Sequence, residues 1–318
     1  MKILYAGTPQ FAVPPLQKLI EVGFEVVGVV TQADKPQGRK GTLTPPPVKV
    51  FAEGKGLPVL QPERIREELS ALSAFGADVM VTCAYGQILT QAVLDLFPKG
   101  VWNIHAGLLP AYRGASPIQN CLLNGETETG VSVMKTELGL DSGDILYVQK
   151  TPVSPTETYG QLSDRLSLIG AECIVAAMNM VKSGAYTLQK QGEDGVNVFR
   201  KINKEHAAID FSKTPNSVVN LVRAMNPAPV AYTAVEGNKV NVYLAEEFPL
   251  LEGSPLALAA ADAAAGEVLS DSPKLGLIVK CGDGAVKLLE VQAAGGKRMS
   301  GGDFLNGRKA RKGQVLSC

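Results

Sequence analysis

Short apolar runs alternate with amphipathic stretches over the first half of the chain. The apolar runs predict strands, and the stretches with a helical period predict helices between them. The predicted strands are Lys2–Tyr5, Glu25–Thr31, Asp78–Ala84, Val101–His105, Val131–Thr136 and Ile145–Val153, and the predicted helices are Val13–Val22, Val48–Gly54, Glu63–Phe75 and Ile88–Phe97. This alternation is typical of a Rossmann-like α/β fold, a mostly parallel sheet with helices on both faces, which binds ligands at the carboxyl ends of its strands.

A long helix is predicted from about Tyr159 to Val181. Thr158 and Gln161 have the spacing of a capping box, and Gly184 is typical of a helix end. The polar stretch that follows predicts a linker. We therefore divide the chain into a first domain at 1–184, a linker at 185–204 and a C-terminal domain at 205–318.

The last third of the chain has short predicted strands joined by tight turns. Two hairpins are expected, with strands Ala231–Val235 and Lys239–Ala245 around Glu236-Gly237-Asn238, and Leu277–Lys280 and Ala285–Val291 around Gly282-Asp283-Gly284. They predict a small antiparallel β-barrel. Ser300 and Asp303 are expected to cap a short helix. The Ala-rich stretch Leu256–Gly266 fits either a helical turn or an insertion loop.

Composition places the chain among ordinary globular proteins, with 45% apolar and 19% charged residues in 318. The sequence has no uninterrupted run of 18 apolar residues and no signal cleavage pattern, so we expect neither a membrane span nor a targeting segment. The cysteines show no CxxC spacing, which indicates a reduced, cytoplasmic protein with buried thiols. They lie at positions 83, 121, 173, 281 and 318. We expect a monomer.

The net charge is zero, whereas nucleic-acid-binding proteins usually carry a basic excess. Two segments are nevertheless locally basic. They contain Lys35, Arg39, Lys40 and Lys49 near the start of the chain, and Lys297, Arg298, Arg308, Lys309, Arg311 and Lys312 near its end. Solvated loops are the commoner meaning of such segments, and contact with nucleic-acid phosphates is the alternative.

The strongest chemical signal is Asn103 and His105 in the run VWNIHAGLLPAYRGASPIQ, followed by Asp141 in GLDSGD. Residues i and i+2 of a strand point to the same face, so the amide and the imidazole project together. An amide can donate to an oxyanion, an imidazole can move a proton and a carboxylate can orient the imidazole. A lone histidine on a strand is more often a core residue, but this combination favours acyl transfer without a covalent nucleophile.

Other catalytic classes receive little support. The turn AGTPQFAV contains neither a GxGxxG nor a P-loop pattern, so a nicotinamide or ATP site is not predicted. His105 and His206 are the only histidines, and no His/Cys cluster has ligand spacing. We therefore expect no metal.

The run NIHAGLLPAYRGASPIQ and the segment GLDSGDILY resemble the signature motifs of the folate-dependent formyltransferases. Segments along the whole chain, among them AGTPQFAVPPLQKL, TQADKPQGRKGTLTPPPVKV, LVRAMNPAPVAYT and GKRMSGGDFLNG, resemble the methionyl-tRNA branch of that family. The resemblance implies a catalytic first domain and a C-terminal β-barrel of oligonucleotide-binding type. It also implies formyl transfer from 10-formyltetrahydrofolate to the α-amino group of methionine on initiator tRNA, in translation initiation.

The resemblance assigns roles to residues. Asn103, His105 and Asp141 are the implied catalytic residues. The folate is expected against the backbone of Gln87, Ile88 and Leu89 and along the loop of Gly107, Leu108, Leu109 and Pro110. The implied tRNA-binding residues are Lys35, Arg39, Lys40, Lys49, Lys297, Arg298, Arg308 and Arg311.

One residue departs from the pattern, because the family usually has serine where this chain has Gly107. The serine hydroxyl is missing and glycine loosens the loop, so we expect a modest effect on folate affinity. Three alternatives are an enzyme that formylates a nucleotide-linked amino sugar, a glycinamide ribonucleotide formyltransferase and a non-enzymatic RNA-binding protein. The basic loop and the GKRMSGGDFLNG tail favour tRNA over an amino sugar as the acceptor. The chain is longer than a one-domain glycinamide ribonucleotide formyltransferase, and the intact Asn103, His105 and Asp141 argue against a non-enzymatic protein.

Overall fold

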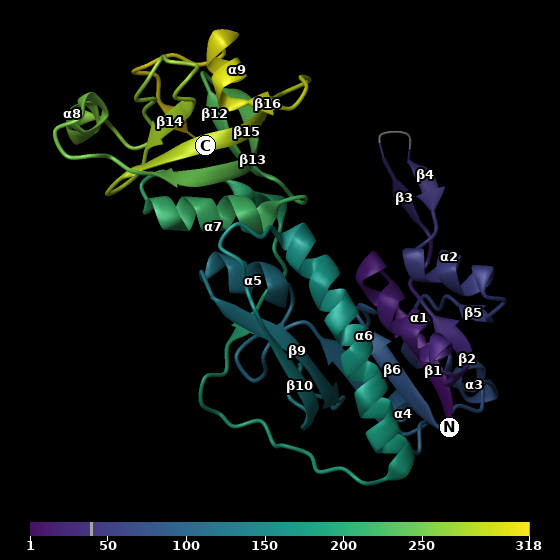
Figure 1. The fold of residues 1–318 in the computed structure, drawn as a ribbon. Coiled ribbons are helices and arrows are strands. Elements are labelled where there is room, and N and C mark those ends of the chain that lie inside the picture. Colours follow the sequence, from purple (N-terminus) through teal and green to yellow (C-terminus); the bar gives the residue numbers. More distant parts are fainter. Residues whose placement is uncertain (39–40, 318) are drawn as a thin grey trace. The chain divides into compact units, whose positions relative to one another are not determined.

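The computed structural model of the chain describes residues 1–38 and 41–317 (Figure 1). These residues form two compact units. Unit 1 consists of Met1–Pro117, Glu128–Pro152 and Ser163–Arg200, and unit 2 consists of Ile118–Thr127, Val153–Leu162 and the chain from Lys201 onwards. The proposed boundaries at 184 and 204 stay a prediction.

Unit 1 is built on a seven-stranded sheet in the order β10-β9-β7-β6-β1-β2-β5. The strands are β1 Lys2–Gly7, β2 Glu25–Val30, β5 Val59–Leu60, β6 Val79–Cys83, β7 Val101–His105, β9 Glu128–Lys135 and β10 Ile145–Pro152. The five strands β1, β2, β5, β6 and β7 are parallel, and β9 runs antiparallel to β7 and β10. This confirms the predicted mostly parallel, Rossmann-like sheet.

Helices cover both faces of this sheet (Figure 1). They are η1 Gln10–Ala12, α1 Val13–Glu21, α2 Pro47–Gly54, η2 Ile65–Glu67, α3 Leu69–Ala74, α4 Gln91–Leu94 and α6 Tyr159–Ser183, of which α6 begins in unit 2. A short hairpin, β3 Lys35–Gln37 and β4 Thr42–Thr44, precedes α2. On one face, Val101 packs in a core with Phe97, Val93 and Met80.

Two helices predicted in unit 1 are shorter than expected. Glu63–Phe75 is a 3-10 turn followed by α3, and only Gln91–Leu94 of Ile88–Phe97 is helical. The Gln87 side chain accepts a hydrogen bond from Ile65 N at 2.8 Å and donates to Pro62 O at 3.1 Å. These bonds hold the backbone at the start of the 3-10 turn, and Glu68, with a φ of −109° and a ψ of 32°, separates that turn from α3.

The predicted linker is bonded to unit 1 as far as Arg200. Within it, β11 Val198–Phe199 pairs in parallel with β8 Arg113–Gly114. Gln189 also forms an isolated bridge with Ile145. Residues 189–199 therefore lie along the loop that follows His105 and beside the start of β10.

Unit 2 contains a curled antiparallel sheet in the order β14-β15-β13-β12-β17, with β16 paired to β15. The strands are β12 Ala231–Val235, β13 Asn238–Phe248, β14 Leu277–Lys280, β15 Ala285–Ala293, β16 Met299–Ser300 and β17 Leu316–Ser317. Residues 266–269 bond to β14 through Lys280 and Ile278 and to residues 313–316 at the other edge. This segment joins the two edges of the sheet, which is the closure that the predicted barrel requires.

The predicted local signals of unit 2 are confirmed. Val235 pairs with Asn238 around Glu236-Gly237, whose φ angles of 49° and 78° suit a tight hairpin turn. The Ser300 hydroxyl accepts from Asp303 N at the start of α9. The Ala-rich stretch contains a helix, not a loop.

The helices of this unit are α5 Pro117–Leu123, whose first residue belongs to unit 1, η3 Lys204–Ala207, α7 Pro215–Met225, α8 Pro255–Asp262 and α9 Gly301–Asn306.

Among the described helices, only α6 is long and apolar enough in composition to cross a membrane, and half of its most apolar stretch is buried in the protein. A core helix of a soluble protein has the same properties.

The predicted capping box at the start of α6 is present, since Thr158 N donates to Gln161 Oε1 at 2.9 Å.

Candidate active site

His105 lies at the carboxyl end of β7 and is almost fully buried. Its Nε2 lies 2.5 Å from the carbonyl oxygen of Tyr112. Because a carbonyl oxygen only accepts, Nε2 carries the hydrogen of this bond. Its Nδ1 lies 3.6 Å from Asp141 Oδ2. Nδ1 is therefore the ring nitrogen at which a proton can be taken up or released.

Asp141 is brought to His105 by the loop between β9 and β10. Its backbone has a φ of 47°, in the left-handed region that aspartate adopts more readily than most residues. Its Oδ2 accepts a hydrogen bond of 2.8 Å from Gly114 N. The carboxylate is therefore fixed by a main-chain amide while the same oxygen faces the imidazole.

Asn103 projects from the same face of β7, two residues before His105. Its Oδ1 accepts a hydrogen bond of 2.9 Å from the Thr82 hydroxyl on β6. This bond orients the amide, because it directs the oxygen toward Thr82 and the Nδ2 donor away from it. The structure thus brings together the three predicted catalytic side chains, with the proton acceptor and the amide donor on one face.

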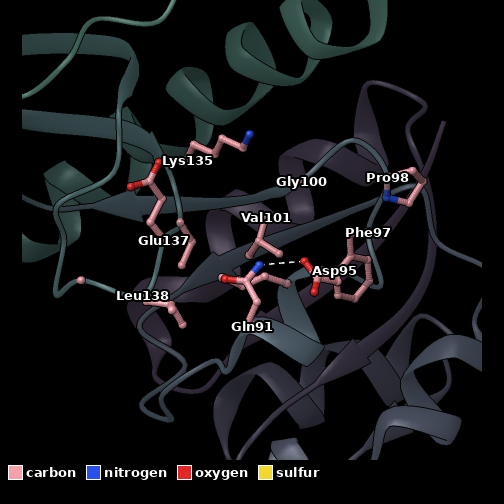
Figure 2. Close-up of a pocket in the computed structure, with 12 residues that line it drawn as sticks. Gln91, Asp95, Phe97, Pro98, Gly100, Val101, Lys135, Glu137 and Leu138 are labelled. Atoms are coloured by element: carbon pink, nitrogen blue, oxygen red, sulfur yellow. Dashed lines mark hydrogen bonds between the residues drawn. The ribbon is translucent and has the colours of Figure 1, made fainter.

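A hollow of about 670 Å³ lies at the other end of this face, where β7 begins. It is lined by Val101 on β7, by residues of α4 and the turn after it, and by the first residues of the Asp141 loop. Figure 2 shows Val101 above Gln91 and Asp95, which are joined by a hydrogen bond of 2.7 Å, together with the side chains of Lys135 and Glu137. The loop that carries Asp141 therefore also forms one wall of the hollow.

Exposed apolar side chains occur on both segments that flank the hollow. Ile88 is 87% exposed in the segment before α4, and Leu138 and Leu140 are 65% and 62% exposed in the Asp141 loop. Large apolar side chains this exposed are unusual unless a ligand or partner covers them. Of these three, Leu138 lines the hollow itself.

The other predicted folate-contacting residues have mixed environments. The Gln87 side chain is bonded to the backbone near Ile65, and Leu89 is buried in the core. Gly107 is buried, and its carbonyl accepts a 2.7 Å bond from Ser132 Oγ, which also accepts from Leu109 N. Leu108 and Pro110 are partly exposed, and Leu109 is buried. These loop residues do not line the hollow.

Two of the predicted tRNA-binding residues of unit 1, Lys35 and Lys49, lie on or near the β3–β4 hairpin. Lys35 Nζ donates to Gln32 Oε1 at 2.6 Å, and Lys49 is paired with both oxygens of Asp34 at 3.0 and 2.9 Å. Hydrogen bonds from Gln61 and Lys49 hold the pKa of the Asp34 carboxyl below its usual value. Arg39 and Lys40 lie outside the described residues.

The cations predicted in unit 2 are exposed: Lys297, Arg298, Arg308 and Arg311. The Arg298 guanidinium stacks 3.5 Å from the ring centre of Tyr243. This cation–π contact orients Arg298 while leaving the edge of its guanidinium for a further partner.

Sequence reasoning missed four residues that hold the catalytic groups: Thr82, Tyr112, Ser132 and Gln191. Thr82, Ser132 and Gln191 act through contacts between segments more than 20 residues apart, and Tyr112 acts through its carbonyl oxygen, so none of the four has a local motif. In the described part of the chain, no group of three or more His, Cys, Asp or Glu side chains could hold a metal ion.

Comparison with known families matches both parts of the chain. Residues 1–178 match the formyl transferase family, and residues 201–309 match the formyl transferase C-terminal domain. A methionyl-tRNA formyltransferase from Neisseria meningitidis serogroup A is 43% identical over 320 residues, covering 99% of this chain and 100% of the relative. One from Geotalea uraniireducens is 39% identical over 318 residues, covering 99% and 98%.

Solved structures of related fold are more distant in sequence. WlaRD, a sugar 3N-formyl transferase solved with dTDP and 5-N-formyl-THF, is 19% identical with a TM-score of 0.65, covering 92% of this chain and 97% of that one. HypX from Aquifex aeolicus, solved with tetrahydrofolic acid, is 18% identical with a TM-score of 0.64, covering 96% of this chain and 47% of that one. They show the shared fold. The family matches and the full-length relatives establish that this chain is a transferase of the formyl transferase family, in its methionyl-tRNA formyltransferase branch.

Proposed function

We propose that this enzyme transfers the formyl group of 10-formyltetrahydrofolate to the α-amino group of methionine on initiator tRNA. The observation that supports this chemistry most directly is the grouping of Asn103, His105 and Asp141 around the end of β7. The acceptor follows from the full-length similarity to methionyl-tRNA formyltransferases.

The three side chains have complementary parts in the reaction. When the amine attacks the formyl carbon, negative charge develops on the former formyl oxygen, and Asn103 Nδ2 is directed to donate to it. The attacking amine must lose a proton and the departing N10 of the folate must gain one. His105 Nδ1 is the nitrogen that can carry this proton, and Asp141 stabilises the resulting imidazolium.

The pterin ring is proposed to lie near the carboxyl end of β6, where the chain continues into Gln87, Ile88 and Leu89. Leu138 on the Asp141 loop and Ile88 before α4 offer exposed apolar surface to cover a ring. The backbone of Gln87, Ile88 and Leu89 is proposed to bind the polar edge of the pterin, with the Leu108–Pro110 loop along the rest of the folate.

The exposed cations are the proposed contacts to tRNA phosphates. Lys297, Arg308 and Arg311 in unit 2 and Lys35 in the hairpin have the best access, whereas Lys49 would have to leave Asp34. Arg39, Lys40 and Arg298 complete the proposed set. Each phosphate contact contributes about 0.7–0.9 to the slope of log affinity against log salt concentration. Binding that does not change with salt would contradict this assignment.

A formyl-transfer assay with several acceptors tests the function. The purified protein is incubated with 10-formyltetrahydrofolate and methionyl-tRNA, an amino-sugar nucleotide or glycinamide ribonucleotide, and the formylated product is measured. We expect product with methionyl-tRNA alone. Product with the sugar nucleotide instead would replace the proposed acceptor while retaining the chemistry.

Paired variants test the catalytic residues. His105→Ala and Asp141→Ala should each lower turnover about 100- to 1,000-fold without unfolding the protein. The matched controls are His206→Ala, which removes the other histidine in η3, and Asp144→Ala, in the same loop as Asp141. Near-normal turnover in His105→Ala or Asp141→Ala would exclude the assigned roles.

A further inference from the structure

Gln191, in the segment that the sequence predicts as a linker, is bonded to both sides of the active site. Its Nε2 donates to the carbonyl oxygens of Asp141 at 2.9 Å and Gly143 at 2.7 Å. Its Oε1 accepts from Arg113 Nε at 2.9 Å. Carbonyls only accept and a guanidinium only donates, so the orientation of this amide is determined chemically, and all of its principal bonding groups are used.

These bonds complete a closed ring of contacts around the catalytic carboxylate. Arg113 is followed by Gly114, whose N–H donates to Asp141 Oδ2. The carbonyl of Asp141 accepts from Gln191, and Gln191 accepts from Arg113. The first contact holds the carboxylate of Asp141, the second holds its backbone, which is in the left-handed region, and the third holds the strand that supplies the amide.

The same segment also supports the other partner of His105. Tyr112, whose carbonyl binds His105 Nε2, stacks against Phe199 with ring centres 5.2 Å apart and planes 10° apart. Ala115 N donates to Phe199 O at 2.9 Å. Gly114 has a φ of 91°, and a Cβ there would lie 2.5 Å from Phe199 O, so the close pairing of β8 with β11 requires glycine.

We propose that Gln191 is a positioning residue of the formyl-transfer reaction, which sets the Asp141 carboxylate against His105 without touching substrate. This inference rests on the proposed function for its chemistry. Loss of the Gln191 hydrogen bonds leaves Asp141 in the chain but frees the loop that carries it. A displacement of 1 Å at a reacting group can cost about 100-fold in rate, so we expect kcat to fall about 10- to 100-fold. The Michaelis constant for methionyl-tRNA should stay within about 2-fold, and the Michaelis constant for the folate should rise by a smaller factor than kcat falls.

The variant Gln191→Met tests the proposal, because methionine keeps the length of the side chain and removes its hydrogen bonds. Gln191→Glu keeps the acceptor for Arg113 but turns a carboxylate oxygen toward the two carbonyls, so its kcat should be at least as low. Gln189→Ala is the matched control, since Gln189 is an exposed glutamine two residues away that joins Ile145 through its backbone. It should retain wild-type rates.

A double-mutant cycle separates positioning from a general structural role. Gln191→Met should lower kcat in the wild-type protein and change it less than 2-fold in an Asp141→Ala background, because the carboxylate to be positioned is gone. An equal loss in both backgrounds, a change in Michaelis constants alone, or an unchanged kcat in Gln191→Met would each overturn the proposal. If the wild-type protein formylates another acceptor, the proposed function fails. The ratio of kcat between the Gln191 variant and the wild type, measured with that acceptor, still tests the positioning role of Gln191.

Discussion

Substitution of Gly107 should disturb the catalytic imidazole because the residue is packed against it. A Cβ at position 107 would lie 3.0 Å from Tyr112 Cβ, 3.2 Å from His105 Nε2 and 3.3 Å from Pro117 Cβ. Ordinary contacts begin at 3.4 Å, so the ring would have to move by about 0.2 Å and Tyr112 by about 0.4 Å. If the logarithm of the rate falls in proportion to displacement, with about 100-fold per ångström, kcat should fall roughly 3- to 6-fold. Overpacking should also cost about 1 kcal/mol of stability.

Gly107→Ala and Gly107→Ser together separate the steric effect from the hydroxyl. Both should lower kcat to a similar extent in steady-state formylation assays with both substrates saturating, and both should lower the midpoint of thermal unfolding. The sequence predicts a modest effect of the missing hydroxyl on folate affinity, which the difference in folate Kd between the serine and alanine variants measures. Wild-type kcat in both variants would refute the packing argument, and equal Kd values would refute the hydroxyl effect.

Three further predictions concern Thr82, Leu138 and the buried thiols. Thr82→Val removes the donor that orients Asn103 and should lower kcat about 5- to 10-fold at unchanged Michaelis constants, whereas Thr82→Ser should retain activity; equal rates in the two would contradict the orienting role. Leu138→Ser should raise the folate Kd about 10-fold by removing apolar cover, and Leu251→Ser, an equally exposed leucine in unit 2, should not. Burial raises the pKa of three thiols to about 12, so the native protein at pH 8 should resist iodoacetamide at these positions by mass spectrometry and react once denatured; rapid native labelling would contradict their burial. These thiols are Cys83, Cys173 and Cys281.

The sequence predicted most of the regular elements because their signals are local. The strand Val101–His105 has its predicted bounds in the structure, and the caps at Thr158 and Ser300 are formed by side chains that bond three residues away. The helix predicted at 63–75 is interrupted at Glu68, and its first residues make a contact far along the chain. Gln87, more than 20 residues downstream, bonds to the backbone near Ile65, and no pattern within that segment records the contact.

The residues of the candidate site could also be predicted from the sequence only in part. Asn103 and His105 could be paired from strand geometry, and Asp141 could be added by motif. The partners that orient them could not be inferred, because a carbonyl such as that of Tyr112 is present at every residue and has no sequence signature. Gln191 is the clearest case. It lies in a polar, glycine-containing stretch whose composition indicates a linker.

The position of His105 explains why the positioning contacts come from loops and not from the sheet. β7 fixes the direction of the side chain, but His105 is the last residue of the strand and pairs with Ser132 on β9 through its backbone, so the partners of its ring come from the loops that follow. Its two nitrogens are therefore held by the loops after β7 and after β9, and each of those loops is bonded in turn to residues 189–199. A reacting group at a strand end gains access to substrate only if its orientation is supplied from outside the sheet. In this chain that role falls to a segment with no regular structure beyond two residues of β11, which continues directly into unit 2.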